Sequence, residues 1–277
     1  MACMVYKNKG FLVYLVFTVL LALAGCSSSG SSENSNNADT GQDPMALNFV
    51  TLYSTVSSIT VHVAYEFDAA PFTGAFPDGS QYWSVLENNL HAIFLGRIIE
   101  PELSIPRDLA GMEQIPDQNQ TSWTTVQVFN LAKSTWDTPQ TSTSAEFYVL
   151  FLNGYFSDKD EVNKQVIGIS IVGTPVIAVF KDAIRESGYT AFFYRIMEQT
   201  TLVHEFGHAV GLVNSGLPMV LDHEDTEHIN HCTNEECVMY WQNDGTSLNF
   251  FIQRIVNSPS DVIFGPECLD DASSFMP

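Results

Sequence analysis

A five-residue run, His-Glu-Phe-Gly-His at positions 204–208, constrains this chain more than any other feature of its sequence. If residues 197–210 form a helix, His204 and His208 lie one turn apart and project from the same face. Two neutral imidazoles at this spacing can bind one Zn²⁺. Glu205 is then placed to take a proton from a metal-bound water rather than to bind the metal. The run therefore predicts a helix that carries a zinc site.

The residues after this run carry a resemblance to a known family. Residues 204–214, HEFGHAVGLVN, resemble the HExxHxxGxxH/D signature of the metzincin zinc peptidases, in which the chain turns at the glycine, here Gly211. Asn214 occupies the position of that signature's third ligand. Residues 231–239, HCTNEECVM, resemble the HCx4CxM continuation of the archaemetzincins. The C-terminal third of the chain is thus metzincin-like and most similar to the archaemetzincins, with residues 214–230 as an insertion.

The resemblance implies that one catalytic Zn²⁺ is the cofactor and that His231 is its third ligand. It also implies that Met239 forms a turn beneath the metal, where a soft apolar side chain packs. The segment between the glycine and His231 is dense in other possible ligands. His223, His228 and Asn214 therefore remain open as alternatives for the third position.

A second metal is not expected from the same comparison. Residues 264–268, FGPEC, resemble the closing CxxC of the family, but Gly265 replaces its first cysteine. The family's structural zinc, held by four cysteines, would lack a ligand here. Cys232, Cys237 and Cys268 then become disulfide candidates in an oxidising compartment. The pairs Cys232–Cys237 and Cys237–Cys268 both remain open.

The activity implied by the resemblance is hydrolysis of peptide or protein substrates by a zinc metalloendopeptidase, with Glu205 as general base. Tyr240 is a candidate donor to the developing oxyanion, although other metzincins place this tyrosine one residue later. Two alternatives are kept: a non-catalytic surface lipoprotein with a structural zinc, and an aminopeptidase.

The N-terminal residues predict export. Residues 1–25 combine a basic start (Lys7, Lys9) with an apolar run that is too short for a comfortable membrane span, as in a signal peptide. Leu-Ala-Gly-Cys at 23–26 resembles a bacterial lipobox, so we expect Cys26 to be lipidated and to anchor the protein in a membrane of the cell envelope. Ser27, rather than an Asp, follows Cys26. In a host with two membranes we therefore expect the protein to be anchored in the outer membrane, facing the periplasm or the cell surface.

Residues 26–43 are rich in Ser, Asn and Gly and predict a flexible tether. Residues 44–277 predict a single catalytic domain, with an N-terminal lobe (44–213) and a smaller C-terminal subdomain (214–277). Hydrophobic residues make up 45% of the chain, enough for a substantial core. The net charge of −21 argues against nucleic acid as a partner. We expect a monomer.

Hydrophobic periodicity predicts a mixed α/β (α+β) fold, with a twisted mixed sheet and an active-site helix. Strands are expected at 57–66, 123–131 and 146–152, and as a pair within 165–180. Helices are expected at 82–95, 197–210 and 247–257, with a helical turn at 181–187. Residues 71–82 and 100–121 are expected to be irregular. The resemblance to the metzincins implies an open edge strand above the zinc that pairs with an extended peptide, and residues 167–172 are the candidate for it. His62 and His91 are expected to be structural.

Overall fold

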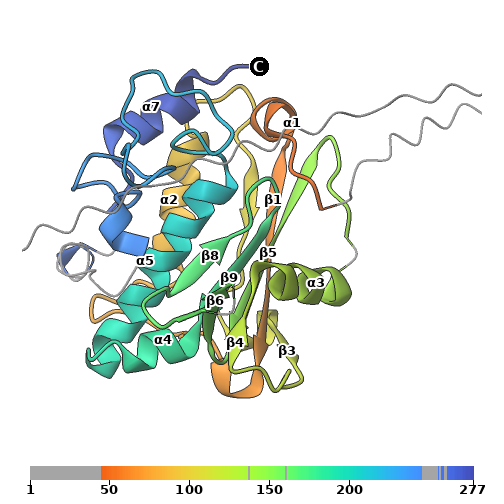
Figure 1. Ribbon diagram of the computed structural model, residues 1–277. Helices are drawn as coiled ribbons and strands as arrows, with labels where there is room; N and C mark the ends of the chain where they lie inside the picture. Colours follow the sequence, from red (N-terminus) through yellow and green to blue (C-terminus); the bar gives the residue numbers. More distant parts are fainter. Residues whose placement is uncertain (1–44, 137, 160, 245–254, 256, 259–260) are drawn as a thin grey trace, which may run out of the picture. The chain divides into compact units, whose positions relative to one another are not determined.

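The computed structural model describes residues 45–136, 138–159, 161–244, 255, 257–258 and 261–277 (Figure 1). Gln42–Pro277 forms one compact unit. Its helices are α1 (Phe49–Ser54), α2 (Ser84–Phe94), α3 (Thr125–Thr135), α4 (Lys181–Glu186), α5 (Ala191–Ala209) and α7 (Pro266–Ser274), with 3-10 turns at Phe67–Ala69, Leu109–Gly111 and Trp241–Asp244. Its strands are β1 (Ser58–Glu66), β2 (Glu102–Ser104), β3 (Glu113–Ile115), β4 (Ser122–Trp123), β5 (Ser144–Leu152), β6 (Tyr155–Asp158), β7 (Glu161–Asn163), β8 (Gly168–Ser170) and β9 (Val176–Phe180).

The main sheet has the order β2-β1-β5-β9-β8, and β3 also pairs with β1. All of its pairs are parallel except β8 with β9, which is antiparallel. β8 lies at the edge of the sheet, as expected for residues 167–172. A smaller sheet joins β4, β6 and β7. The mixed α/β class predicted from the sequence is confirmed.

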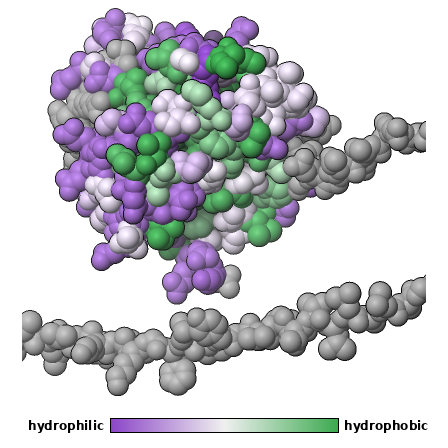
Figure 2. All heavy atoms as spheres, turned by 90° about the horizontal axis from the view of Figure 1, so that it is seen from above, coloured by the Kyte–Doolittle hydropathy of each residue, from purple (hydrophilic) through white to green (hydrophobic). Residues whose placement is uncertain are grey.

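Helices cover both faces of the main sheet, with α5 and α2 on one side and α3 on the other (Figure 1). The surface seen in Figure 2 mixes hydrophilic residues with separate groups of hydrophobic ones. Among the described residues, no helix has both the length and the apolar character needed to cross a membrane.

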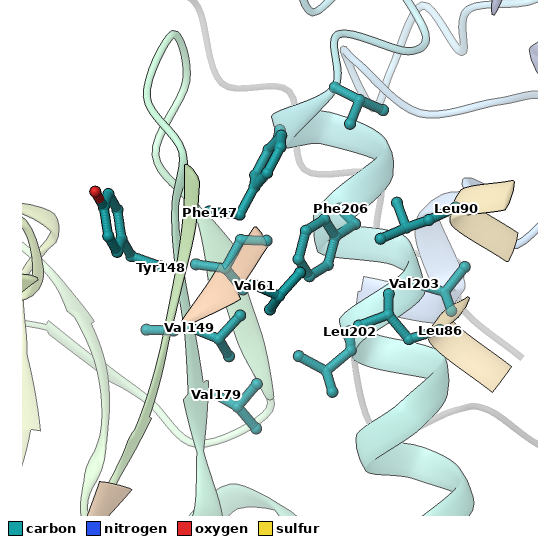
Figure 3. Close-up of a cluster of buried hydrophobic side chains, with 14 of the residues drawn as sticks. Val61, Leu86, Leu90, Phe147, Tyr148, Val149, Val179, Leu202, Val203 and Phe206 are labelled. Carbon is teal, nitrogen blue, oxygen red and sulfur yellow. The ribbon is translucent and has the colours of Figure 1, made fainter. Parts of the chain in front are cut away.

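The core lies between the sheet and α5, and it fixes the position of that helix. Phe147 of β5 points toward Phe206 of α5, with ring centroids 5.3 Å apart (Figure 3). Leu86 and Leu90 of α2 pack behind α5 (Figure 3). Because successive strand residues face opposite sides, Tyr148 points the other way. Side chains such as these bury apolar area on both faces of the sheet.

The strand predicted for residues 123–131 is wrong, because α3 occupies most of it. Thr124 caps this helix, and its side chain and that of Gln127 form a reciprocal capping box. Val128 is fully buried whereas Val126 is 67% exposed. The apolar alternation that suggested a strand is thus the start of a helix with one buried face.

Of the remaining secondary-structure predictions, the helical turn at 181–187 is confirmed as α4, whereas the irregular segment 100–121 is only partly so. The expected strands 57–66 and 146–152, the strand pair in 165–180, and the helices at 82–95 and 197–210 are all present. α1, β6, β7 and α7 were not predicted, and the irregular segment 100–121 contains β2 and β3. The helix predicted for 247–257 falls almost wholly outside the described residues.

Candidate metal centre

Helix α5 carries His204, Glu205 and His208 along its last two turns, and its end is sharply defined. The amides of Gly211 and Leu212 donate to the carbonyls of His208 and Gly207, at 3.0 and 2.9 Å. Gly211 has a φ of +94°. This is the Schellman arrangement, and its left-handed residue favours glycine. The turn that the sequence placed at Gly211 is therefore present.

Three imidazoles meet at this end of α5. The Nε2 atoms of His204 and His208 lie 3.1 Å apart. His231 joins them from the later segment, and the ligand atoms of all three side chains lie within 4.8 Å of one another. For a tetrahedral zinc with bonds of 2.0–2.1 Å, the nitrogens would be separated by roughly 3.3 Å. The cluster is thus compact enough for all three rings to reach one ion.

The other ring nitrogens fix how each imidazole is presented. His204 Nδ1 donates to the carbonyl of Val238 at 2.7 Å, and His231 Nδ1 donates to that of Ile229 at 3.0 Å. A carbonyl can only accept, so both Nδ1 atoms carry the proton and both Nε2 atoms keep a lone pair. His208 Nδ1 lies 3.5 Å from Ser215 Oγ. Metal-binding histidines commonly have such partners. The residues therefore fit Zn²⁺ as three Nε2 donors.

The electrostatic environment also favours a neutral His208 ring. Burial lowers the pKa of His208 well below its usual value, and the neighbouring His204 and His231 lower it further. A neutral imidazole is the form that binds a metal. His204 is fully buried, whereas His208 and His231 are partly exposed. The cluster thus has a closed side and an open side.

Backbone pairing brings His231 to the helix. The amide of Asp225 donates to the carbonyl of His231 at 2.7 Å, and the amide of Cys232 donates to that of Met239 at 2.8 Å. Asn230, just before, has a φ of +67°, which an asparagine tolerates better than most residues. His231 therefore lies on a segment held from both sides.

The three alternative third ligands lie elsewhere. Asn214 donates to Glu224 at 3.2 Å. The ring of His228 stacks on Trp241, with centroids 4.0 Å apart and planes 3° from parallel. His223 contacts the cysteines. Of the four candidates, His231 is the one that the structure groups with His204 and His208.

Met239 packs directly against the active-site helix. A Cβ built on Gly207 would lie 2.2 Å from the sulfur of Met239, so a side chain at 207 would displace it. Met239 is fully buried. The glycine inside the His-Glu-Phe-Gly-His run thus makes room for the methionine, a role that the sequence alone did not reveal.

A pocket of about 220 Å³ opens on the exposed side of the three histidines. It is lined by the edge strand, α5 and the His231 segment: Phe156, Val166, Gly168, Ile169, Ser170, Val172, Glu205, His208, Ile229, Asn230 and His231. Glu205 is 2% exposed and reaches the pocket from α5. Tyr240, the candidate oxyanion donor, is not among these lining residues.

Gly168 permits the close contact between β8 and α5. A Cβ at this position would lie 2.5 Å from Thr201 Cγ2 and 3.0 Å from Glu205 Cγ. Sequence reasoning missed this residue, although a glycine within a strand pattern often marks a close approach of this kind. The edge strand can therefore lie beside the carboxylate.

The predicted disulfides are absent from the described residues. Cys232, Cys237 and Cys268 are buried thiols. The sulfurs of Cys237 and Cys268 are 3.5 Å apart, well beyond the bond length of about 2.05 Å. Both candidate pairings are therefore wrong for this structure. His62 and His91 lie outside the cluster, with His62 bonded to Glu146 at 2.8 Å.

Comparison with known proteins finds similarity to solved structures alone, at low identity. No family model matches the sequence, and no curated protein matches it. Among solved structures, the chain is similar to a zinc-dependent peptidase from Methanocorpusculum labreanum (16% identity, TM-score 0.42) and to archaemetzincin from Archaeoglobus fulgidus complexed with malonate (14% identity, TM-score 0.35). Each alignment covers 76% of this chain and 99% of the other.

Proposed function

We propose that this protein is a zinc-dependent metalloendopeptidase whose single catalytic ion is held by His204, His208 and His231. The observation that carries the proposal is the meeting of the three imidazoles beside a buried glutamate, Glu205, at an open pocket. Three protein ligands with one position left open are typical of catalytic rather than structural zinc.

When bound, zinc would lower the pKa of a water molecule and polarise the scissile carbonyl. The protein supplies the remaining chemistry. Glu205 follows the first ligand on α5 and shares the pocket with His208, so its carboxylate can take a proton from the attacking water. The same carboxyl can then deliver that proton to the departing amine. Val238 and Ile229 hold two of the rings through their carbonyls and so fix the direction of the ligand nitrogens.

The substrate is proposed to bind as an extended peptide along β8. This strand is at the edge of the sheet and lines the pocket with Gly168, Ile169 and Ser170. An edge strand can pair with a peptide through its backbone groups. Pairing of this kind does not require a free terminus, which favours an endopeptidase over an aminopeptidase. Cleavage of peptides blocked at both ends would support this class, and cleavage restricted to free N-termini would refute it.

The test of the mechanism is Glu205→Gln. This change keeps the size of the side chain and removes its ability to accept a proton. We expect zinc content to remain at the wild-type level while turnover of a blocked peptide library falls by at least about 100-fold. Glu227→Gln, at an exposed glutamate of the 214–230 insertion, is the matched control and should retain full activity. Full activity in Glu205→Gln would refute the mechanism and leave a non-catalytic zinc protein.

We also propose that the protein acts as an exported, monomeric lipoprotein in the cell envelope. The support is the sequence of residues 1–43, which lies outside the described residues. Cys26→Ser should shift the protein from the membrane fraction to the soluble fraction of the producing cell. Unchanged membrane association of this variant would contradict lipid anchoring at Cys26.

A further inference from the structure

A second cluster of potential metal ligands lies behind the three histidines. Cys232 and Cys237 come from the segment that follows His231, Cys268 comes from α7, and His223 comes from the 214–230 insertion. All four side chains are buried. His223, Cys232 and Cys268 place one ligand atom each within 4.8 Å of one another, and the sulfur of Cys237 lies 3.5 Å from that of Cys268. Three of these ligand atoms therefore form one group, and the fourth, the thiol of Cys237, adjoins it through Cys268.

The spacing suits a metal better than it suits a disulfide. For a tetrahedral zinc, with bonds of about 2.3 Å to sulfur and 2.0–2.1 Å to nitrogen, two sulfurs would be roughly 3.8 Å apart and a sulfur and a nitrogen roughly 3.6 Å. The distances are 3.5 Å between Cys237 and Cys268 and 3.3 Å between His223 Nδ1 and Cys232 Sγ. Both are within a few tenths of an ångström of the tetrahedral values.

Backbone amides point at the sulfurs. The amides of Gly265 and Met239 donate to Cys237 Sγ at 3.0 and 3.4 Å, and the amide of Asn234 donates to Cys232 Sγ at 3.4 Å. Hydrogen bonds to a thiolate favour its charged form, which is the form that binds metal. The surrounding backbone is thus arranged for anionic sulfur rather than for inert core thiols.

Gly265 occupies the place where the sequence lacked a fourth cysteine. A Cβ at Gly265 would lie 2.9 Å from Cys237 Cβ, so this backbone is too close for a side chain to enter. His223 reaches Cys232 and Cys268 from a different part of the chain. Its Nε2 lies 2.7 Å from Asp271 Oδ2, and Asp271 Oδ1 in turn accepts the amide of Val220 at 2.7 Å.

We propose that Cys232, Cys237, Cys268 and His223 bind a second, structural Zn²⁺, with Asp271 as the residue that positions His223. Asp271 accepts a hydrogen bond from the N–H of Nε2 and so directs the lone pair of Nδ1 to the metal, as carboxylates do for many zinc-bound histidines. Four protein ligands leave no position for water, so the site is closed and takes no part in catalysis. On this proposal, a ligand 42 positions earlier in the sequence takes the place of the cysteine that is missing at position 265.

The second zinc would hold the parts of the chain that complete the first site. Its ligands flank His231 and Met239, and they tie this segment to α7 and to the insertion. The proposal does not depend on catalysis at the three histidines, and the two can fail separately.

The test is metal analysis of the full-length protein, with the metal content and the thiols measured on the same sample. We expect two zinc ions per chain and three cysteines besides Cys26 and Cys3 that become reactive toward a thiol reagent only after chelation or unfolding. Replacement of zinc by Co²⁺ should give sulfur-to-cobalt charge-transfer absorption, which three histidines alone cannot produce. One zinc per chain with a Cys237–Cys268 disulfide in the mass spectrum would overturn the proposal.

Variants assign the fourth ligand. His223→Ala should lose the second zinc, and Asp271→Asn should weaken its binding by about 10–100-fold, the usual effect of removing a partner of a zinc-bound histidine. His91→Ala, at an exposed histidine of α2, is the matched control and should keep both ions. If His223→Ala retains two ions and an unchanged cobalt spectrum, His223 is not a ligand. If that variant does not fold, Asp271→Asn and the wild-type spectrum decide the question.

Discussion

The three-histidine cluster and the cysteine cluster share the segment 231–239 but differ in their access to solvent. The three-histidine cluster is open on one side, adjoins a pocket of about 220 Å³ and has Glu205 next to it. The cysteine cluster is buried on all sides and has a fourth protein ligand in place of the opening. An open coordination position lets the metal bind and activate a water molecule. A metal with four protein ligands has no such position and contributes only to the stability of the fold. The access of water to the metal, rather than ligand type alone, separates a catalytic metal site from a structural one.

The largest expected effect is on the open site. His208→Ala removes a partly exposed ligand and should lower turnover by more than about 100-fold, since even the partner of a ligand is worth up to that much. The zinc at the cysteines should stay, with its cobalt absorption unchanged. Metal content, the cobalt spectrum and peptide turnover check this prediction. Loss of both ions would show that the two clusters are not independent.

The closed site should govern stability. Cys268→Ser removes a buried ligand, and structural zinc contributes about 10–16 kcal/mol in small zinc peptides. Losing even about 4 kcal/mol should lower Tm by roughly 8–16 °C in a domain of this size. Calorimetry of the wild type and the variant, each in its metal-loaded state, measures the shift. An unchanged Tm would contradict a structural role for this cluster.

A buried ion pair outside both clusters separates stability from metal binding. Lys181 bonds to Glu198, and both side chains are almost inaccessible to solvent. Lys181→Met leaves the carboxylate without its cation and should cost about 3–5 kcal/mol with no loss of zinc. Denaturant unfolding and metal analysis check the two halves of this prediction.

The same variant has a defined pH dependence. Burial raises the pKa of Glu198 above its usual 4.5, and Lys181 opposes this rise. Without the lysine, the folded state binds a proton that the unfolded chain lacks at pH values between 4.5 and the raised pKa. Stability of the variant should therefore fall as pH rises through this window and recover as pH drops toward 4.5. A cost that is independent of pH would contradict this explanation.

The smallest effect is expected where the two clusters meet. Met239→Leu conserves volume and should cost less than about 1.5 kcal/mol, with both ions retained. Gly207→Ala provides the contrast, because its Cβ would meet the methionine sulfur at 2.2 Å. Thermal unfolding of both variants checks the difference. Equal stability of the two variants would show that Met239 can move away from α5 at little cost.

The sequence predicted local features better than long-range ones. The helix with His204 and His208 and the turn at Gly211 both depend on residues near one another in the chain. The edge position of β8 depends on the order of the whole sheet and was expected from the resemblance to the metzincins. The helix α3 could also have been found, since Thr124 and Gln127 have the spacing of a capping box.

Local patterns alone could not separate the three histidines at positions 223, 228 and 231, and only the resemblance to the archaemetzincins singled out His231. His223, His228 and His231 lie within nine residues, and no local pattern distinguishes a ring that stacks on Trp241 from one that faces α5. The bond from His223 to Asp271 spans 48 residues and exists only once α7 has packed. The sequence therefore shows that a cysteine is missing at position 265, but it does not show that His223 lies beside Cys232 and Cys268.

The most direct test of the central claim is anomalous scattering at the zinc edge from crystals of the metal-loaded protein. We expect a peak about 2.0–2.1 Å from the Nε2 atoms of His204, His208 and His231, with a water or substrate atom as the remaining ligand. A map without density among these rings, or with a fourth side chain closing that position, would contradict it.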